Sequence, residues 1–400
     1  MSVKINLPGK EDVREIAGEI AAQTAAMKAY FSAAQSGLTF VQTWAEFKHL
    51  CQLGTIKKYF AVGDKLKCQY NGKDLLWDIA HIGDNEDGSN YVILQTHYCL
   101  DETMPFDGQE AIFKAPAELS AGTYHFKMPL TGVTDTDWTD PTKSGWSKTW
   151  QFTTTKSVPK GGIIKFENIA EYNVDIATRK IVTRASPESD ANIETLSLTE
   201  GTAGTDLATL GTVNHAQRAC FGYNRWRDSD IRQWLNSGAE AGKWWSQRND
   251  FDTRTTMYGA AGFMHGLDED FKAVITKSKI TTNTNKITED GSNDTTYDYF
   301  FLPTMKNLNA GDQDSTNPED TTIWDYYKKF RQDGKTGENS GRDPNRLKGT
   351  STGGDIWWWE RSPVDSDTYY VRNVVPREGI ASWGHGAYFQ FGVAPACRIN

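Results

Sequence analysis

The chain has 400 residues, more than one ordinary domain needs, which predicts two or three domains or one domain with a large insertion. Hydrophobic residues make up 38% and charged residues 24%, a balance that can bury a core and excludes a disordered chain. The net charge of −9 argues against nucleic acid as a partner, and since no run approaches about 18 apolar residues, we expect no membrane insertion.

Residues 11–35 have the heptad spacing of an amphipathic helix, and we assign residues 1–38 to this N-terminal segment. About two and a half heptads make a lone coiled coil marginal. Two alternatives therefore stay open: the helix docks on its own domain, or it mediates oligomerisation. The first residues lack the apolar run of a secretory signal peptide. Two rows of residues recur every seven positions: Val13, Ile20 and Met27, and Ile16, Gln23 and Tyr30.

Residues 39–108 have the alternation of short β-strands. Phe60–Lys73 alternates apolar and polar residues and turns at Asn71-Gly72, a dipeptide that favours a tight hairpin. Leu75–Ile82 and Tyr91–Thr96 continue the pattern. We therefore predict a compact antiparallel β-unit in this region.

Residues 109–216 predict a β-sandwich-like insertion, because helical periodicity is low and turn signals are regularly spaced. Within it, residues 186–212 are rich in Ser, Thr, Glu and Gly and predict a long loop. The strand candidates are Thr123–Met128, Thr149–Thr154, Gly162–Glu167 and Lys180–Thr183.

Residues 217–400 combine helices and strands, which makes the whole chain an α+β protein. Ser229 stands before residues with helical spacing up to Asn236 and is a typical N-cap. A second helix is predicted over Leu267–Thr276, where acidic residues in the first turn suit the helix dipole. The chain then continues in short strands rich in Trp, Tyr and Phe.

Residues that could bind a metal are scattered along the sequence. The five Cys and seven His residues show neither Cys-x-x-Cys spacing nor a helical i, i+4 pair, so we predict no metal site and no required cofactor. The acidic run Asp84–Gly88 lacks the ligand register of a calcium loop and predicts a plain turn. Calcium could still add stability through residues 84–90 without being required, so we expect EDTA to change neither folding nor binding.

Catalytic motifs are not apparent either. Ser362 has no Gly-x-Ser-x-Gly context, and no glycine-rich loop is present that would hold a phosphate. Acidic residues are plentiful, at 52, so their occurrence on loops carries no specific signal. We therefore predict a protein that is not an enzyme.

The C-terminal 44 residues carry the strongest signal, a concentration of aromatic side chains. In Tyr369-Tyr370 and Tyr388-Phe389-Gln390-Phe391 neighbouring rings would point to opposite faces of a strand. Core packing cannot absorb all of them, so we expect at least half to face outwards. An exposed cluster of Tyr, Trp and Phe among Asp, Ser, Arg and His is typical of a binding surface.

The sequence resembles phage and prophage tail-associated receptor-binding proteins whose C-terminal domain has the C-type-lectin fold, shared with formylglycine-generating enzymes. This group includes variable proteins diversified by retroelements, of the major tropism determinant type. The similarity covers about residues 60–100 and 217–400, with the insertion between them. The motifs that carry it are Arg225–Asn236, Gly262-Phe263-Met264, Tyr299–Pro303, Trp358–Pro363 and Gly392–Ala396.

The resemblance implies a rigid scaffold that displays variable side chains near the C-terminus. We find neither the calcium-dependent sugar ligands of some lectins of this fold nor a match to the cysteine pair of the formylglycine-generating enzymes. The implied scaffold residues are Trp358, Arg361, Pro363, Gly392, Pro395 and Ala396. The implied ligand-binding residues are Asp365, Asp367, Tyr369, Tyr370, Arg377, Ser382, Trp383, His385, Tyr388, Phe389 and Phe391.

The function that the resemblance implies is receptor binding by a phage tail tip or fibre. The expected partners are a bacterial cell-surface protein or glycan and other phage tail proteins, with the chain as a homo-oligomer, a trimer by analogy with tail fibres. The expected location is the virion, after synthesis in the bacterial cytoplasm without a signal peptide. Two alternatives remain: an enzyme of the virion that acts on polysaccharide, and a structural tail protein that uses its aromatic face for assembly.

Overall fold

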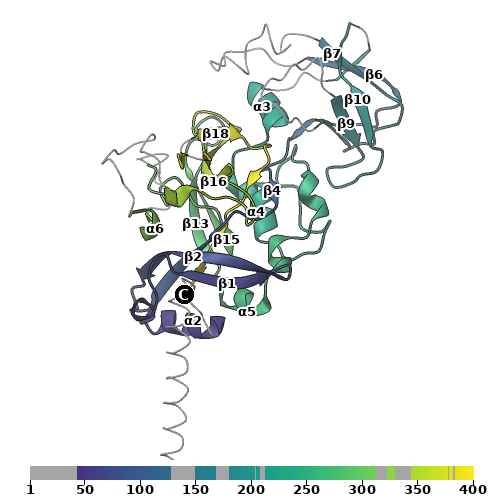
Figure 1. Cartoon of the computed structure of the whole chain (residues 1–400). Helices are drawn as coiled ribbons and strands as arrows, with labels where there is room; N and C mark the ends of the chain where they lie inside the picture. The colour runs from purple at the N-terminus through teal and green to yellow at the C-terminus, as the bar shows by residue number, and fades with distance from the viewer. Residues whose placement is uncertain are drawn as a thin grey trace, which may run out of the picture. The chain divides into compact units, whose positions relative to one another are not determined.

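The computed structural model in Figure 1 is a mixed α/β protein, mostly β-sheet with few helices, as expected for the coarse fold class. The chain divides into two compact units: one holds residues up to His97 together with 267–276 and 398–400, and the other holds 98–266 and 277–397. The predicted helix at 11–35 lies outside the described residues. The structure describes residues 43–127, 149–167, 180–202, 204–207, 212–311, 322–328, 344–376, 378–381 and 383–400.

The first unit contains the predicted hairpin. Strands β1 (Lys65–Tyr70), β2 (Lys73–Asp84) and β3 (Asn90–Thr96) pair in an antiparallel meander. Asn71 and Gly72 connect β1 to β2 with φ values of 51° and 73°. Because few residues other than Gly and Asn adopt this left-handed region readily, the dipeptide determines a two-residue turn and hence the register.

A short helix that we did not predict completes the core of this unit. Helix α2 (Trp44–Gln52) follows Thr43, whose hydroxyl and the Glu46 carboxylate form a capping box. The rings of Trp44 and Trp77 lie 4.5 and 5.2 Å from that of Phe271. Phe271 belongs to α5 (Glu269–Val274), which confirms the helix predicted over Leu267–Thr276.

In the second unit, residues 109–207 form two four-stranded sheets, ordered β10-β9-β8-β5 and β11-β7-β6-β12. The strand candidates of the sequence correspond to β6, β7, β8 and β9. The predicted loop at 186–212 is wrong in part, because it also supplies β10, β11 and β12. The strands are β5 (Ala111–Lys114), β6 (Gly122–Lys127), β7 (Thr149–Thr154), β8 (Ile163–Phe166), β9 (Lys180–Arg184), β10 (Glu194–Ser197), β11 (Thr199–Glu200) and β12 (Thr205–Asp206).

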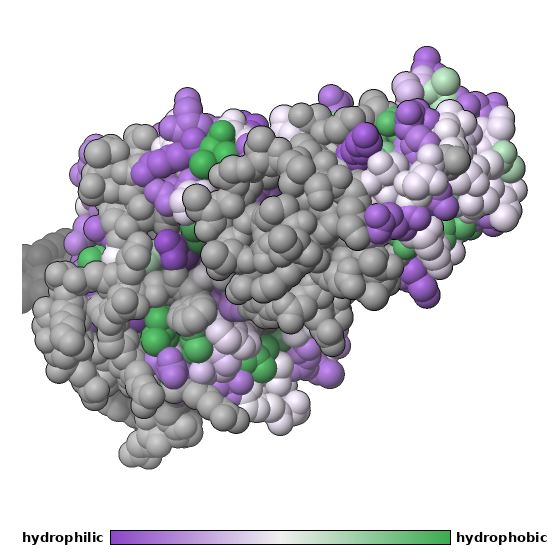
Figure 2. Space-filling view, turned by 90° about the horizontal axis from the view of Figure 1, so that it is seen from above, coloured by the Kyte–Doolittle hydropathy of each residue, from purple (hydrophilic) through white to green (hydrophobic). Residues whose placement is uncertain are grey.

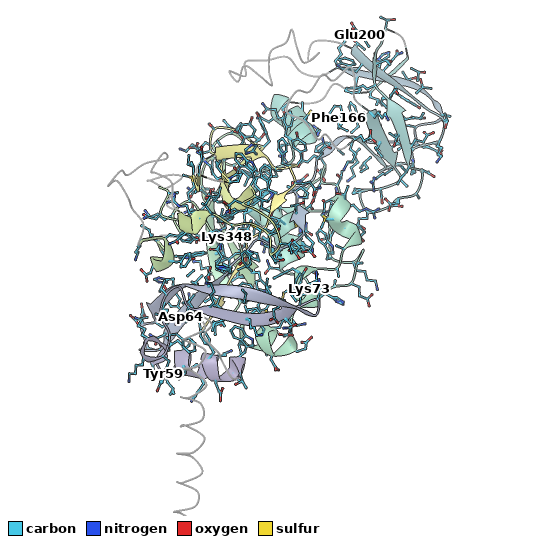
Figure 3. The ribbon with its side chains drawn as sticks, viewed as in Figure 1. Tyr59, Asp64, Lys73, Phe166, Glu200 and Lys348 are labelled. Carbon is cyan, nitrogen blue, oxygen red and sulfur yellow. The ribbon has the colours of Figure 1, made fainter. Side chains whose placement is uncertain are left out.

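Both of these sheets contribute to one hydrophobic core. Trp150 and Phe152 of β7 and Phe166 of β8, labelled in Figure 3, are buried in it. Helix α3 (Val213–Phe221), which lies next to the sheets in Figure 1, adds Ala216 and Cys220. The same core also includes aromatic residues from the C-terminal part of the chain.

The rest of the second unit holds the predicted capped helix and the C-terminal strands. Ser229 accepts a hydrogen bond from Arg232 N and caps α4 (Asp230–Leu235), as predicted. The other elements are hairpin β13 (Ser278–Asn283) and β14 (Asn293–Asp298), β15 (Phe300–Phe301) paired with β20 (Ala396–Ile399), helix α6 (Asp325–Lys328), and a five-stranded sheet β18-β17-β16-β19-β4. The strands of that sheet are β4 (Thr103–Met104), β16 (Trp358–Pro363), β17 (Tyr370–Val374), β18 (Trp383–Gly386) and β19 (Phe391–Gly392).

On the face in Figure 2, apolar side chains form small separate patches among polar residues. Within the described ranges, no helix has both the length and the apolar composition needed to cross a membrane.

Candidate functional site

The five-stranded C-terminal sheet is built on a fully buried central strand. All six residues of β16 are buried. The indole N–H of Trp358 donates to the carbonyl of Arg346, and that of Trp359 to the carbonyl of Met104, each at 2.9 Å. Because both polar atoms of these large rings are satisfied, the strand is held in one arrangement.

The implied scaffold residues all lie in the interior. Arg361 is completely buried: its Nε donates to Thr282 Oγ1 at 3.1 Å, its Nη1 donates to the Leu302 carbonyl, and its guanidinium lies 5.6 Å from the centre of the Phe301 ring. Hydrogen bonds to these fixed partners hold the strand against β13 and β15. The remaining scaffold residues, also buried, are Trp358, Pro363, Gly392, Pro395 and Ala396.

The buried side-chain amide of Asn224 holds the loop between β16 and β17 in place. Asn224 Nδ2 donates to the carbonyls of Val364, Asp367 and Tyr370 at 3.2, 3.0 and 3.1 Å. Asn224 Oδ1 in turn accepts from Asn285 Nδ2 at 3.1 Å. The loop that carries several implied ligand-binding residues is therefore held by the framework.

The two implied acidic ligand residues of this loop are half-buried and partnered within the protein. Asp365 forms an ion pair with Lys286 at 2.8 Å. Asp367 Oδ1 accepts from the backbone N–H groups of Tyr369 and Tyr370 at 3.0 and 2.6 Å. Asp367 therefore shapes the loop through an Asx-type turn.

Three half-exposed rings form an aromatic cluster at the C-terminal sheet: Trp357, Phe389 and Phe391. Trp357 stacks on Phe391 with centroids 5.8 Å apart, and Phe389 stacks on Phe391 at 5.7 Å. The buried ring of His385 lies edge-on against all three, at 4.7 to 5.6 Å. Tyr370, also half-exposed, was likewise among the implied ligand-binding residues.

His385 supports this cluster as a neutral ring. Burial lowers the pKa of His385 to about 4, so the imidazole is uncharged near neutral pH. Asn373 Nδ2 lies 2.9 Å from His385 Nδ1, and as an amide donor it makes Nδ1 the acceptor. The hydrogen bond thus favours the tautomer protonated at Nε2.

We predicted that Tyr369, His385 and Tyr388 are exposed, and this prediction is wrong. They are 1%, 5% and 8% exposed, and both tyrosine rings pack on Phe221 of α3, at 5.0 and 5.8 Å. For Tyr388 the alternation argument failed because the chain is not extended there: residues 387–390 form the turn between β18 and β19. A turn can direct two neighbouring rings to the same side.

Other implied ligand-binding residues are not placed by the structure. Arg377 and Ser382 lie outside the described residues, and for Trp383 the structure describes the backbone in β18 but not the side chain. The roles of these three stay predictions.

The fold also brings together three carboxylates that no sequence motif connects. Asp107, Asp230 and Asp252 each place an oxygen within 4.8 Å of the others, and all three are buried. Only Asp230 lies on a predicted element, at the start of α4, and no spacing relates it to the other two. A non-local contact of this kind leaves no pattern in a single sequence.

The acidic run at Asp84–Gly88 is a turn, as predicted. Asp84 forms an ion pair with Lys57 and accepts from Asn90 Nδ2 at 2.7 Å. Asp87 Oδ1 accepts from the backbone N–H of Ser89 at 3.0 Å. These carboxylates are paired within their own surroundings and do not converge on one point.

Comparison with known proteins gives one match. A family model described as Domain of unknown function (DUF6273) matches residues 194–400, which include α3, α4 and the strands from β13 to β20. No curated protein matches the chain, and no solved structure matches it. Since the matched segment spans just over half of the 400 residues, the chain belongs to the DUF6273 family, a family of unknown function.

Proposed function

We propose that the protein is a non-enzymatic binding protein in which a C-type-lectin-like module, formed by residues 60–100 and 217–400, carries residues 109–216 as a sandwich-like insertion. The observation that carries the proposal is the half-exposed aromatic cluster of Trp357, Phe389 and Phe391 on a fully buried, hydrogen-bonded strand. Large rings held rigidly offer contact area at a low cost in conformational entropy.

The biological setting follows from the resemblance together with this surface. We propose a receptor-binding protein of a phage tail tip or fibre, located in the virion, whose target is a protein or glycan on the bacterial surface. Half-exposed Tyr370 begins β17 of the same five-stranded sheet and adjoins the loop that Asn224 holds. Variation at exposed positions would change specificity while the buried framework stays the same, which suits diversification by a retroelement.

The alternative of a polysaccharide-acting enzyme is less well supported. Glycoside hydrolysis uses two carboxylates that flank the bond in a cleft open to the sugar chain. Asp107, Asp230 and Asp252 are at most 3% exposed. A polysaccharide cannot reach carboxylates buried in this way.

The test replaces Trp357 and Phe389 together by Ala in the full chain and measures binding of the labelled protein to cells of the bacterium that carries the gene. We expect binding to fall at least about tenfold, since such anchors contribute about 1–4 kcal/mol each. Tyr297→Ala, at a ring 58% exposed elsewhere in the unit, is the matched control and should bind as wild type does.

Unchanged cell binding by the double variant, with an unchanged melting temperature, would refute the proposal. Loss of self-association with no effect on cell binding would instead favour the assembly role. Sequencing of the neighbouring DNA gives a second test, because a reverse transcriptase gene with a near-repeat of the C-terminal coding segment is expected beside a diversified protein.

A further inference from the structure

The loop that joins β13 to β14, residues 284–292, is held by side chains of the segment before α4. The Arg225 guanidinium pairs with Glu289 of this loop at 2.7 Å and with Asp294 of β14 at 2.6 Å. The Tyr223 hydroxyl also donates to Glu289. Since the side chains of Arg225, Glu289 and Asp294 are at most 19% exposed, water screens these pairs only partly, and they restrict the loop.

Asn285 fixes the course of this loop from inside. It is 1% exposed, and its Nδ2 donates to Asn224 Oδ1 at 3.1 Å. Its Oδ1 accepts from the backbone N–H groups of Ile287 and Thr288 at 3.0 and 2.8 Å. A buried amide therefore holds the backbone that carries these two residues, as Asn224 holds the loop between β16 and β17.

The two loops are also joined to each other. Lys286 N donates to the Asp365 carbonyl at 2.8 Å, and Lys286 Nζ pairs with the Asp365 carboxylate, also at 2.8 Å. Asn224 contacts both loops, since it accepts from Asn285 and donates to the carbonyl of Asp367. The loops thus present one continuous surface, which we call the two-loop surface. It consists of the exposed or half-exposed residues Lys286, Ile287, Thr288, Asp365 and Ser366.

Ile287 gives the two-loop surface an apolar anchor. Its side chain is 48% exposed, whereas its backbone is fixed by Asn285. A side chain held in this way loses little further conformational freedom when a partner covers it. An apolar centre with a polar rim is the usual composition of a protein–protein contact. A sugar ring, by contrast, stacks on the flat face of an aromatic ring, which Ile287 does not have.

The charge of the two loops indicates which partners fit them. Residues 284–292 and 364–369 contain four carboxylates and one Lys, and Arg225 pairs with one of these carboxylates. Four negative charges against two positive ones leave a net charge of −2. Anionic polymers of a bacterial surface would be repelled, whereas a protein patch with basic side chains would be attracted. The four carboxylates are Glu289, Asp290, Asp365 and Asp367.

We propose that the two-loop surface binds a protein on the bacterial cell, with Ile287 entering an apolar pocket that basic side chains surround. This inference rests on the proposed function and extends it in two ways. It identifies the target as a protein and not a glycan. It also adds residues 284–292, which the resemblance did not include among the implied ligand-binding residues.

The test measures binding of the labelled full chain to cells of the bacterium that carries the gene. Ile287→Ala should reduce binding at least about fivefold, because it removes the anchor. Ser366→Arg should reduce it further, because a long cation on the second loop would hold off and repel the basic partner. Both positions are exposed, so the melting temperature should stay that of wild type. Tyr297→Ala, on β14 of the same hairpin, is the matched control and should bind as wild type does.

Treatment of the cells before binding identifies the chemical class of the target. Protease should remove wild-type binding, whereas periodate, which oxidises glycans, should leave it unchanged. Binding that survives protease and is lost after periodate would overturn the protein target. Wild-type binding by both Ile287→Ala and Ser366→Arg would overturn the role of the two-loop surface.

The double variant of Trp357 and Phe389 separates this inference from the proposed function. If only the double variant loses binding, the aromatic cluster binds the target and the two-loop surface does not, so the inference fails and the proposed function stands. If the double variant and both loop variants bind as wild type does, the proposed function fails as well. Loss of binding in the double variant and in both loop variants, at unchanged melting temperatures, supports both.

Discussion

Replacing Asn224 by Asp should loosen the loop between β16 and β17. The two side chains have nearly the same shape, but Asp presents oxygen where the amide nitrogen now donates to three carbonyls at 3.0 to 3.2 Å. An amide has two hydrogens, so two hydrogen bonds are lost, at about 1 kcal/mol each, and a carboxylate oxygen set against the carbonyl oxygens adds a comparable cost. The expected loss of unfolding free energy is about 3 kcal/mol.

Urea unfolding followed by Trp fluorescence measures this loss, and the variant Asn224→Ala separates its causes. Ala removes the donor without placing an oxygen against the carbonyls, so it should destabilise no more than Asp does. If Asn224 merely fills space, the order reverses and Asp is tolerated. If Asn224→Asp is as stable as wild type, the Asn224 side chain does not hold the loop in place.

Three further outcomes are expected. His385 has a pKa of about 4 in the folded protein, whereas in the unfolded chain it is protonated near pH 6.5. Its contribution to the stability is therefore present above pH 6.5 and is lost as the pH falls towards 4. Across this range the urea midpoint of wild type should fall relative to that of His385→Gln. Tyr388→Ala should cost about 3 kcal/mol in urea unfolding through loss of core contacts, and a fully stable variant would contradict its burial. Removal of residues 1–36 should reduce the oligomer measured by light scattering, and equal masses with and without them would exclude the oligomerising helix.

Local signals in the sequence were reliable where the structure depends on neighbouring residues. Asn71-Gly72 makes the turn it predicts, and Ser229 caps the helix it predicts. Helix α2 was not predicted, although its capping box, Thr43 and Glu46, is local, because a helix of nine residues is too short to show a clear apolar periodicity.

Features that depend on distant residues could not be predicted. Tyr388 is buried because Phe221, far away in the sequence, packs on it, and the alternation rule did not apply to the turn in which it lies. The carboxylates Asp107, Asp230 and Asp252 converge from three segments without a shared motif. Only the three-dimensional arrangement shows which of the many acidic residues meet.

The pairing of β19 with β4 has a consequence for how the protein folds. Phe391 pairs with Met104, and Gly392 with Thr103, although the two-sheet region and the elements from α3 to β18 lie between them in the chain. Closing so long a loop costs entropy before any contact rewards it, so the C-terminal sheet should form late and slowly. The antiparallel pair of β6 and β7, which contributes Trp150 and Phe152 to the shared core, is joined by a much shorter segment and can form first. A refolding experiment should then show early burial of Trp150 and delayed burial of Trp358 and Trp359, with a long-lived intermediate whose β19 and β4 edges are exposed to aggregation.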